Sequence, residues 1–233
     1  LSWLAATLRS QGITSVTGSV VADAAQRAAE ELTRLRDESD AGGVDVEDVY
    51  FRFLAVSNDL MNAQKATATL ATSEGVPAAT TRAIQDVLTI GHLTQVASRQ
   101  VPLYLGSIFT NGDESLIGSR TAWQTAWLDY TDGERQMATL SQPSLRAEWR
   151  RVSSSDAVVR VDRLLESGLA PAAPGSTGMV IQDVVTLLAD SQVRSDLLAG
   201  LVGTAVDEAQ SLVAADRERA SSQVRGILVL SAS

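Results

Sequence analysis

Apolar residues recur at steps of three and four over most of the chain, which is the spacing of one face of an α-helix. The most regular run comprises Val49, Phe53, Val56, Leu60, Ala63, Thr67 and Leu70. A seven-residue repeat keeps one face toward a neighbour over several turns. The run therefore predicts a long helix that packs nearly parallel or antiparallel to its partners.

A second helix is predicted before this run, and loops are predicted around both. Ser15 is placed to cap the earlier helix, and residues 37–43, which include two glycines, are expected to form the loop that follows. Asp45 is placed to cap the helix over 49–70, and Gly75-Val76-Pro77 is expected to end it. The apolar stripe of the earlier helix comprises Val21, Ala25, Ala28, Leu32 and Leu35.

The next helix is predicted from Ala78 to Phe109, with Pro102 inside it. Proline removes one backbone hydrogen bond and clashes with the preceding turn. We therefore expect a kink or a break between Arg99 and Pro102.

The remaining helices are expected on both sides of one long loop. A fifth helix is predicted from Ser115, with Trp123, Trp127 and Tyr130 on one face. A sixth is predicted from Pro143, with an interruption at residues 153–155. Residues 168–178, rich in glycine and proline, are expected to form the loop. The last helix is predicted from about Met179 to Leu230, with a stripe of Leu197, Leu201, Ala205, Ala209 and Leu212.

One stretch of sequence occurs twice, about a hundred residues apart. Residues 3–8 and 104–109 both begin with an aromatic residue and a leucine, and both are followed by a Ser-x-x-Gly-Ser frame, at 15–19 and 115–119. The repeat suggests a single domain, 1–233, built from two related halves of about 1–90 and 91–233. No segment reads clearly as a strand, so the predicted fold class is all-α.

Composition favours a bundle of closely packed helices. Hydrophobic residues make up 45% of the chain but aromatic residues only 4%, so the core must consist of Ala, Val and Leu. The net charge of −9 makes nucleic acid a poor partner. The absence of cysteine excludes disulfides and thiol catalysis.

The chain carries no recognisable catalytic pattern. His92 is the only histidine, and no Gly-x-Ser-x-Gly turn, phosphate loop or dinucleotide fingerprint is present. We therefore expect no catalytic residue, no metal site and no cofactor, and a helical enzyme is a remote alternative.

Two arginines are the candidate ligand-binding residues. Arg99 lies beside the predicted break at Pro102, where a freed helix end would attract an anion, and Arg120 follows the second Ser-x-x-Gly-Ser frame. The guanidinium fork suits oxyanions. The alternative for both is a solvated arginine on a helix flank. For Trp123 and Trp127, a role in the core is favoured over ligand stacking.

Both ends of the chain are apolar. Leu1 lies in an apolar helix-like pattern, and residues 226–230 turn apolar again. We expect a piece that lies between two membrane helices, with a trimmed soluble domain as the alternative.

The sequence resembles the nitrate- and nitrite-sensing (NIT-type) domains, especially those that lie outside the membrane in actinobacterial sensor histidine kinases. The resemblance is diffuse and covers most of the chain. It is carried by Leu1-Ser2-Trp3-Leu4-Ala5, by Leu32-Thr33-Arg34-Leu35-Arg36 leading into Val49-Tyr50, and by the Ala-rich last helix through Asp216-Arg217-Glu218-Arg219.

The resemblance implies two stacked antiparallel helical bundles that share long helices. It also implies an extracytoplasmic sensor domain of a two-component histidine kinase at the cell membrane, with flanking transmembrane helices and a cytoplasmic kinase module, as a homodimer. A small anion such as nitrate or nitrite would bind between the bundles, with Arg99 in the position of a ligand-binding arginine. The alternative is a ligand-free helical module for dimerisation or protein interaction.

Overall fold

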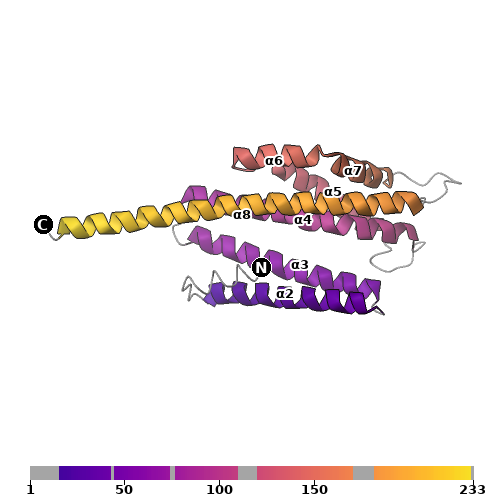
Figure 1. The fold of residues 1–233 in the computed structure, drawn as a ribbon, viewed down its shortest axis with the longest axis horizontal. Coiled ribbons are helices and arrows are strands. Elements are labelled where there is room, and N and C mark those ends of the chain that lie inside the picture. The colour runs from indigo at the N-terminus through magenta and orange to yellow at the C-terminus, as the bar shows by residue number, and fades with distance from the viewer. Residues whose placement is uncertain (1–15, 43–44, 74–76, 110–119, 170–180, 232–233) are drawn as a thin grey trace. The chain divides into compact units, whose positions relative to one another are not determined.

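The computed structural model describes residues 16–42, 45–73, 77–109, 120–169 and 181–231. In these ranges the chain forms seven helices, labelled α2 to α8 (Figure 1), and no strand. The predicted all-α class is therefore confirmed. The chain divides into two compact units, Leu1–Thr81 and Arg82–Ser233. The stacking of two bundles and the relationship between halves of about 1–90 and 91–233 stay predictions.

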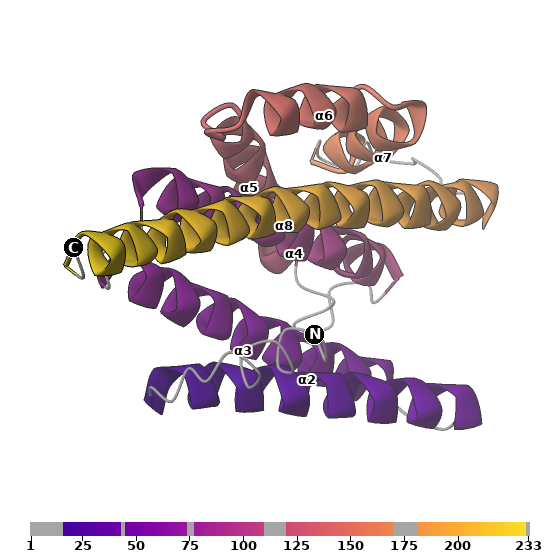
Figure 2. The same cartoon turned by 60° about the vertical axis from the view of Figure 1, so that its left-hand side comes forward.

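The first unit contains α2 (Val16–Ala41) and α3 (Val46–Ser73), which lie side by side (Figures 1 and 2). Ala28 and Leu35 of the predicted α2 stripe are buried, as is Val56 of the α3 stripe. Phe53 was expected on the packed face of α3 but is 36% exposed, and Tyr50 is buried instead. Within its unit α3 packs against α2, and the side chains of Leu60, Thr67 and Leu70 of the predicted stripe lie outside the described residues.

The predicted loop over residues 37–43 is largely helical. Helix α2 continues to Ala41, because polar side chains such as Asp37 do not by themselves end a helix. Gly42 ends it with a φ of 78°, a left-handed conformation that glycine adopts at low cost. The predicted cap at Asp45 is confirmed, since its Oδ1 accepts the Glu47 N–H at 2.9 Å. Ser15, the other predicted cap, lies outside the described residues.

Helix α4 (Ala78–Phe109), which belongs to the second unit from Arg82 onward, is a continuous helix with Pro102 inside it. The predicted break between Arg99 and Pro102 is therefore wrong, whereas the alternative, a kink, stays a prediction. A proline inside a helix costs about 3 kcal/mol. Its neighbours Val101 and Leu103 are each at least 95% buried, and their packing offsets that cost.

Three shorter helices follow, and their ends agree with the sequence where the structure describes them. They are α5 (Arg120–Met137), α6 (Pro143–Ser153) and α7 (Asp156–Ser167), so the predicted start at Pro143 and the interruption at 153–155 are confirmed. The predicted start of the fifth helix at Ser115 and most of the loop over 168–178 lie outside the described residues. The last helix, α8, is described from Ile181 to Ser231.

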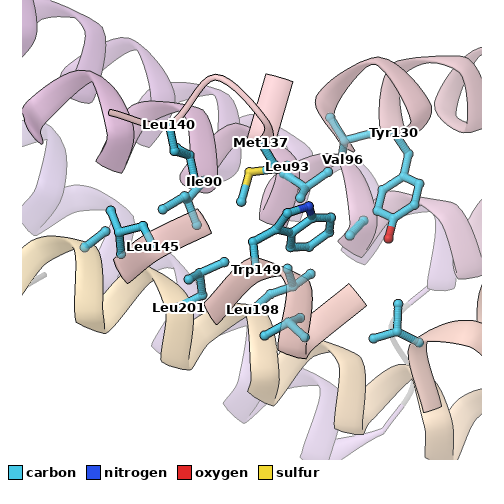
Figure 3. Packing of buried hydrophobic residues seen from close by; sticks show 14 residues of the cluster. Ile90, Leu93, Val96, Tyr130, Met137, Leu140, Leu145, Trp149, Leu198 and Leu201 are labelled. Atoms are coloured by element: carbon cyan, nitrogen blue, oxygen red, sulfur yellow. The ribbon is translucent and has the colours of Figure 1, made fainter. Parts of the chain in front are cut away.

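The core of the second unit brings together side chains from α4, α5, α6, α7 and α8. Figure 3 shows Trp149 of α6 among Leu93, Met137 and Leu198. Helices α4 and α5 approach closely at Gly133, where an added Cβ would lie only 2.9 Å from Leu93 Cδ1. The buried members of this core are Ile90, Leu93, Val96, Ala97, Tyr130, Met137, Leu140, Leu145, Trp149, Val152, Val158, Leu198, Leu201 and Ala205.

The predicted stripe of the last helix and the predicted aromatic face are both found in this unit. Leu201, Ala205 and Ala209 are buried on α8. On α5, Trp123 and Tyr130 are each 1% exposed, and the ring of Trp127 lies 5.8 Å and 6.3 Å from theirs. A core role for the tryptophan pair agrees with this packing.

Candidate functional site

A charged side chain lies inside the second unit. Arg194 of α8 is 1% exposed and shares a helical stripe with the buried Leu187, Leu198 and Leu201. A buried charge is costly unless its neighbours compensate it. The groups around this guanidinium therefore define the most unusual polar site in the described part of the chain.

Arg194 contacts three other helices through its guanidinium. Nη1 donates to Gln100 Oε1 at 2.8 Å and Nη2 donates to the Ala97 carbonyl at 3.0 Å, both on α4. Nη1 also lies 3.3 Å from Oδ1 of Asp162 on α7. The ring of Tyr130 on α5 lies beneath it, 5.4 Å from the guanidinium carbon. One side chain thus joins α4, α5, α7 and α8.

The charge of this single cation affects the pKa of two carboxyl groups. The pKa of Glu134 on α5 is raised to about 7, by burial first and then by the nearby Asp162, while Arg194 and a hydrogen bond with Tyr130 act in the opposite direction. Burial also raises the pKa of Asp162, against the effects of Arg194 and Tyr130. The site therefore contains more acidic groups than its cation can neutralise.

The hydrogen bonds of the site are incomplete. Gln100 is fully buried, and its Nε2 has no hydrogen-bond partner among the described residues. Its Oε1 accepts from Arg194, which fixes the orientation of the amide. A buried donor left unpaired costs about 1–3 kcal/mol. We call this set the Arg194 cluster, and its members are Ala97, Gln100, Tyr130, Glu134, Asp162 and Arg194.

The Arg194 cluster is better suited to binding a proton and to linking helices than to making or breaking covalent bonds. It holds a carboxyl that titrates near neutral pH and a cation that stays charged at every physiological pH. In the described ranges, no group of three or more His, Cys, Asp or Glu side chains is arranged to hold a metal ion.

The two arginines predicted as ligand-binding residues lie on different helices. Arg99 is half-buried on α4, one residue before Gln100 and so about 100° around the helix from it. Arg120 is exposed at the start of α5, and its Nη2 donates to the Leu169 carbonyl at 3.3 Å, just after α7. Their ligand-binding role stays a prediction.

The sequence contained a pattern that would have located Arg194. The stripe Leu187, Arg194, Leu198, Leu201 has helical spacing, so a charged residue stands in a core position. Gln100 likewise follows the buried Ala97 and precedes the buried Tyr104 on α4. A polar residue inside an apolar stripe is a stronger indication of a site than an arginine beside a proline.

A second group of charges lies in the first unit, at the surface. Arg52 of α3 pairs with Glu31 and Glu38 of α2 at 2.8 Å and 2.6 Å, and hydrogen bonding to Arg52 lowers the pKa of Glu38. An open groove of about 490 Å³ lies beside it. Arg34 and Arg52, which line this groove, are already paired with carboxylates, so this group reads as a bridge between helices.

One stretch of α8, Asp183–Asp216, is long and apolar enough to cross a membrane by length and composition. It is also the helix that carries Arg194 and packs against α6 and α7 in the second unit. Core helices of soluble proteins pass the same test of length and composition, so the stretch is weak support for a membrane association.

Comparison with protein-family models, with curated proteins and with solved structures finds no match to this chain.

Proposed function

We propose that the chain is a helical sensor domain that passes a signal along α8. The observation that carries this proposal is the continuity of α8, which is 51 residues long. Arg194 anchors it in the core of the second unit, and Ala209 is its last buried residue among those whose side chains are described. Figure 1 shows its C-terminal part, in yellow, continuing beyond the ends of α5, α6 and α7.

A continuous helix can carry a displacement over a long distance. At about 1.5 Å per residue, the helix from Arg194 to Ser231 is about 55 Å long. A rotation or shift imposed at Arg194 by its partners on α4, α5 and α7 would therefore reach the far end of α8. Rigid helix movements of this kind are a common form of signalling between sites.

The polarity of the distal part of α8 supports a membrane context. Its charged segment includes Asp216 and Arg219, paired at 2.8 Å, and the apolar residues 226–230 follow. A charged segment before an apolar one is typical of a helix that approaches a lipid bilayer. With the family resemblance, this pattern leads us to propose an extracytoplasmic sensor of a homodimeric histidine kinase, connected through transmembrane helices to a cytoplasmic kinase module.

The transmission role can be tested by changing the phase of α8. The chain is joined through α8, in register, to the transmembrane helix and kinase of a well-characterised receptor. One to seven alanines are then inserted after Ala214, which is exposed. Because each residue rotates the helix by about 100°, kinase output should vary with a period near 3.6 residues. Output that is independent of the insertion length would contradict the proposal.

The proposed ligand is a small anion such as nitrate or nitrite, with Arg99 and Arg120 as candidate contacts. Calorimetric titration of the chain with each anion should give a saturable heat that is lost in Arg99→Ala. The matched control is Arg135→Ala, because the side chain of Arg135 is 78% exposed on α5. No heat with either anion, or equal heat in both variants, would contradict an anion site at Arg99.

One observation favours the alternative, a ligand-free interaction module. Helix α8 exposes several large apolar side chains, namely Val185, Leu188, Val193 and Val213. Such residues on one helix can serve helix–helix association between two copies. Light scattering separates the two functions: a stable dimer that dissociates in Leu188→Glu, together with silence in the anion titrations, would favour the module.

A further inference from the structure

We propose that the Arg194 cluster is a proton-operated switch, in which protonation of the Glu134 carboxyl sets how α8 packs against α4, α5 and α7. The inference deepens the proposed sensor role by naming a stimulus, and it rests on that role for its biological use. Its physical content, a proton-linked movement of α8, can be measured independently of any signalling output.

The ionisable groups of the site come from three helices. Glu134 and Tyr130 lie on α5, Asp162 and the more distant Glu166 act from α7, and Arg194 is the cation on α8. Helix α4 contributes neutral acceptors, the Gln100 amide and the Ala97 carbonyl. Helix α6 contributes the apolar Trp149 and Val152 to the same core.

The charge balance of the cluster depends on one proton. When Glu134 is protonated, the positive charge of Arg194 balances the negative charge of Asp162. When Glu134 ionises, two partly buried carboxylates share one buried guanidinium. An uncompensated buried charge is costly, so the ionised cluster must rearrange or admit water.

The observed geometry leaves the guanidinium able to change partners. Its shorter bonds go to the neutral acceptors of α4, at 2.8 Å to Gln100 and 3.0 Å to Ala97, while Asp162 lies at 3.3 Å. Charge-assisted bonds are stronger than bonds to neutral acceptors. An ionised Glu134 would therefore draw Arg194 away from α4 and toward α5.

The unpaired Nε2 of Gln100 lowers the cost of that change. This amide is fixed by the bond from Arg194 to its Oε1, and in that orientation its own donor is buried without a partner. Release of Arg194 frees the amide to turn and to pair Nε2 with a new acceptor. The arrangement with Arg194 on α4 thus carries a penalty that the alternative arrangement removes.

The neutral range is where this switch would act. Burial raises the pKa of the Glu134 carboxyl to about 7, so a change of one pH unit on either side of neutrality alters its charge. Arg194 remains charged throughout, so the proton on Glu134 is the variable. The expected direction is release of Arg194 from α4 as the pH rises.

Distance measurements between α5 and α8 test the switch. The chain has no cysteine, so Gln124→Cys and Ala199→Cys, both at exposed positions, create a unique pair for spin labels. Pulsed electron paramagnetic resonance should show a change in the distance distribution between about pH 5 and pH 9, with a midpoint near 7. Glu134→Gln, which imitates the protonated carboxyl, should hold the acid distribution at every pH.

The matched control is Asp132→Asn, an exposed carboxylate on the same helix, which should respond as the labelled parent does. Circular dichroism at pH 5 verifies that each variant is folded, and carboxyl ¹³C nuclear magnetic resonance follows Glu134 in the unsubstituted chain. The proposal is overturned if Glu134→Gln keeps the pH response, if the parent shows no distance change, or if Glu134 titrates at its ordinary value. Phase-independent output in the α8 chimera would contradict the sensor role without touching any of these results.

Discussion

Gln100 and Arg194, 94 positions apart in the chain, form a buried hydrogen bond of 2.8 Å between α4 and α8. Neither residue is more than 1% exposed. Contacts this distant in sequence form only when the whole unit has folded. Each of the two polar groups then relies on the other to offset the free-energy cost of its burial. The bond therefore reports on the integrity of the second unit.

Removal of the Arg194 guanidinium should destabilise the second unit strongly. Arg194→Met keeps much of the side-chain volume but leaves the buried Gln100 and the partly buried Asp162 without their partner. Breaking a buried ion pair from one side costs about 3–5 kcal/mol. Urea unfolding followed by circular dichroism should show this loss, whereas Arg135→Met at the surface should cost less than about 0.5 kcal/mol. A loss below about 1 kcal/mol for Arg194→Met would show that the cluster is dispensable.

The bond between Arg194 and Gln100 should appear as a coupling in a double-mutant cycle. Gln100→Leu alone leaves Arg194 without one acceptor, whereas Gln100→Leu combined with Arg194→Met removes both partners. Groups in direct contact show interaction energies of about 0.5–3 kcal/mol. The double variant should therefore be more stable than the sum of the two single effects predicts. Strict additivity in the same urea experiments would contradict a shared bond.

Stability should fall as the pH rises through the neutral range. The pKa of Glu134 is raised in the folded chain, from 4.5 to about 7, so the folded state binds the proton more tightly than the unfolded state does. The stabilisation is fully present below about pH 4.5 and is lost as the pH approaches 7. A complete shift of this size would correspond to roughly 3 kcal/mol, and partial exposure reduces it to about 1–2 kcal/mol.

Urea midpoints at several pH values measure this effect when the parent is compared with Glu134→Gln. The difference between the two isolates Glu134 from Asp162, whose raised pKa acts in the same direction, and from Glu38, whose lowered pKa acts in the opposite direction at acidic pH. The stability of Glu134→Gln relative to the parent should increase between about pH 5 and pH 7.5. Parallel curves would show that Glu134 has an ordinary pKa.

Asp86 should matter more than an exposed aspartate, because it is buried and holds the turn that precedes another helix. Its carboxylate on α4 accepts the amide N–H groups of Ser141 and Gln142, at 2.8 Å and 3.2 Å, just before α6. Charged hydrogen bonds to buried groups contribute about 1.5–3 kcal/mol, so Asp86→Ala should cost about 2–3 kcal/mol in thermal or urea unfolding. Asp132→Ala on α5 is the surface control. Equal losses in the two variants would argue against this role of Asp86.

The sequence was most informative where local chemistry decides the structure. Pro143 fixed the start of α6 because proline suits a first helical turn, and Asp45 capped α3 through its own neighbouring backbone. The helical stripe of α8 likewise predicted Leu201, Ala205 and Ala209 as core residues. These features depend on residues within a few positions of one another.

The sequence was less informative where distant residues decide. The break expected near Pro102 is absent because packing on both sides of it holds α4 continuous. The Arg194 cluster was missed because its members lie on four helices, and only the fold brings Gln100, Tyr130 and Asp162 to one guanidinium. Arg99 was chosen for its place beside the proline. It is next to Gln100 of the cluster in the sequence, but it lies on another face of α4.

Ala209 is the last buried residue of α8 among those whose side chains are described, and this has a consequence for the energetics of the helix. Up to that residue the helix shares the global stability of its unit. Over residues 210–216 no side chain is buried, so this stretch depends more on intrinsic propensity and on local ion pairs such as Asp216–Arg219. Helices without tertiary packing are marginal in water, so the distal amides should open at a free energy close to zero. The segment proposed to transmit the signal would then become rigid only through packing against a neighbouring helix or a bilayer. The fraction of a movement at Arg194 that reaches the end of α8 would depend on that packing.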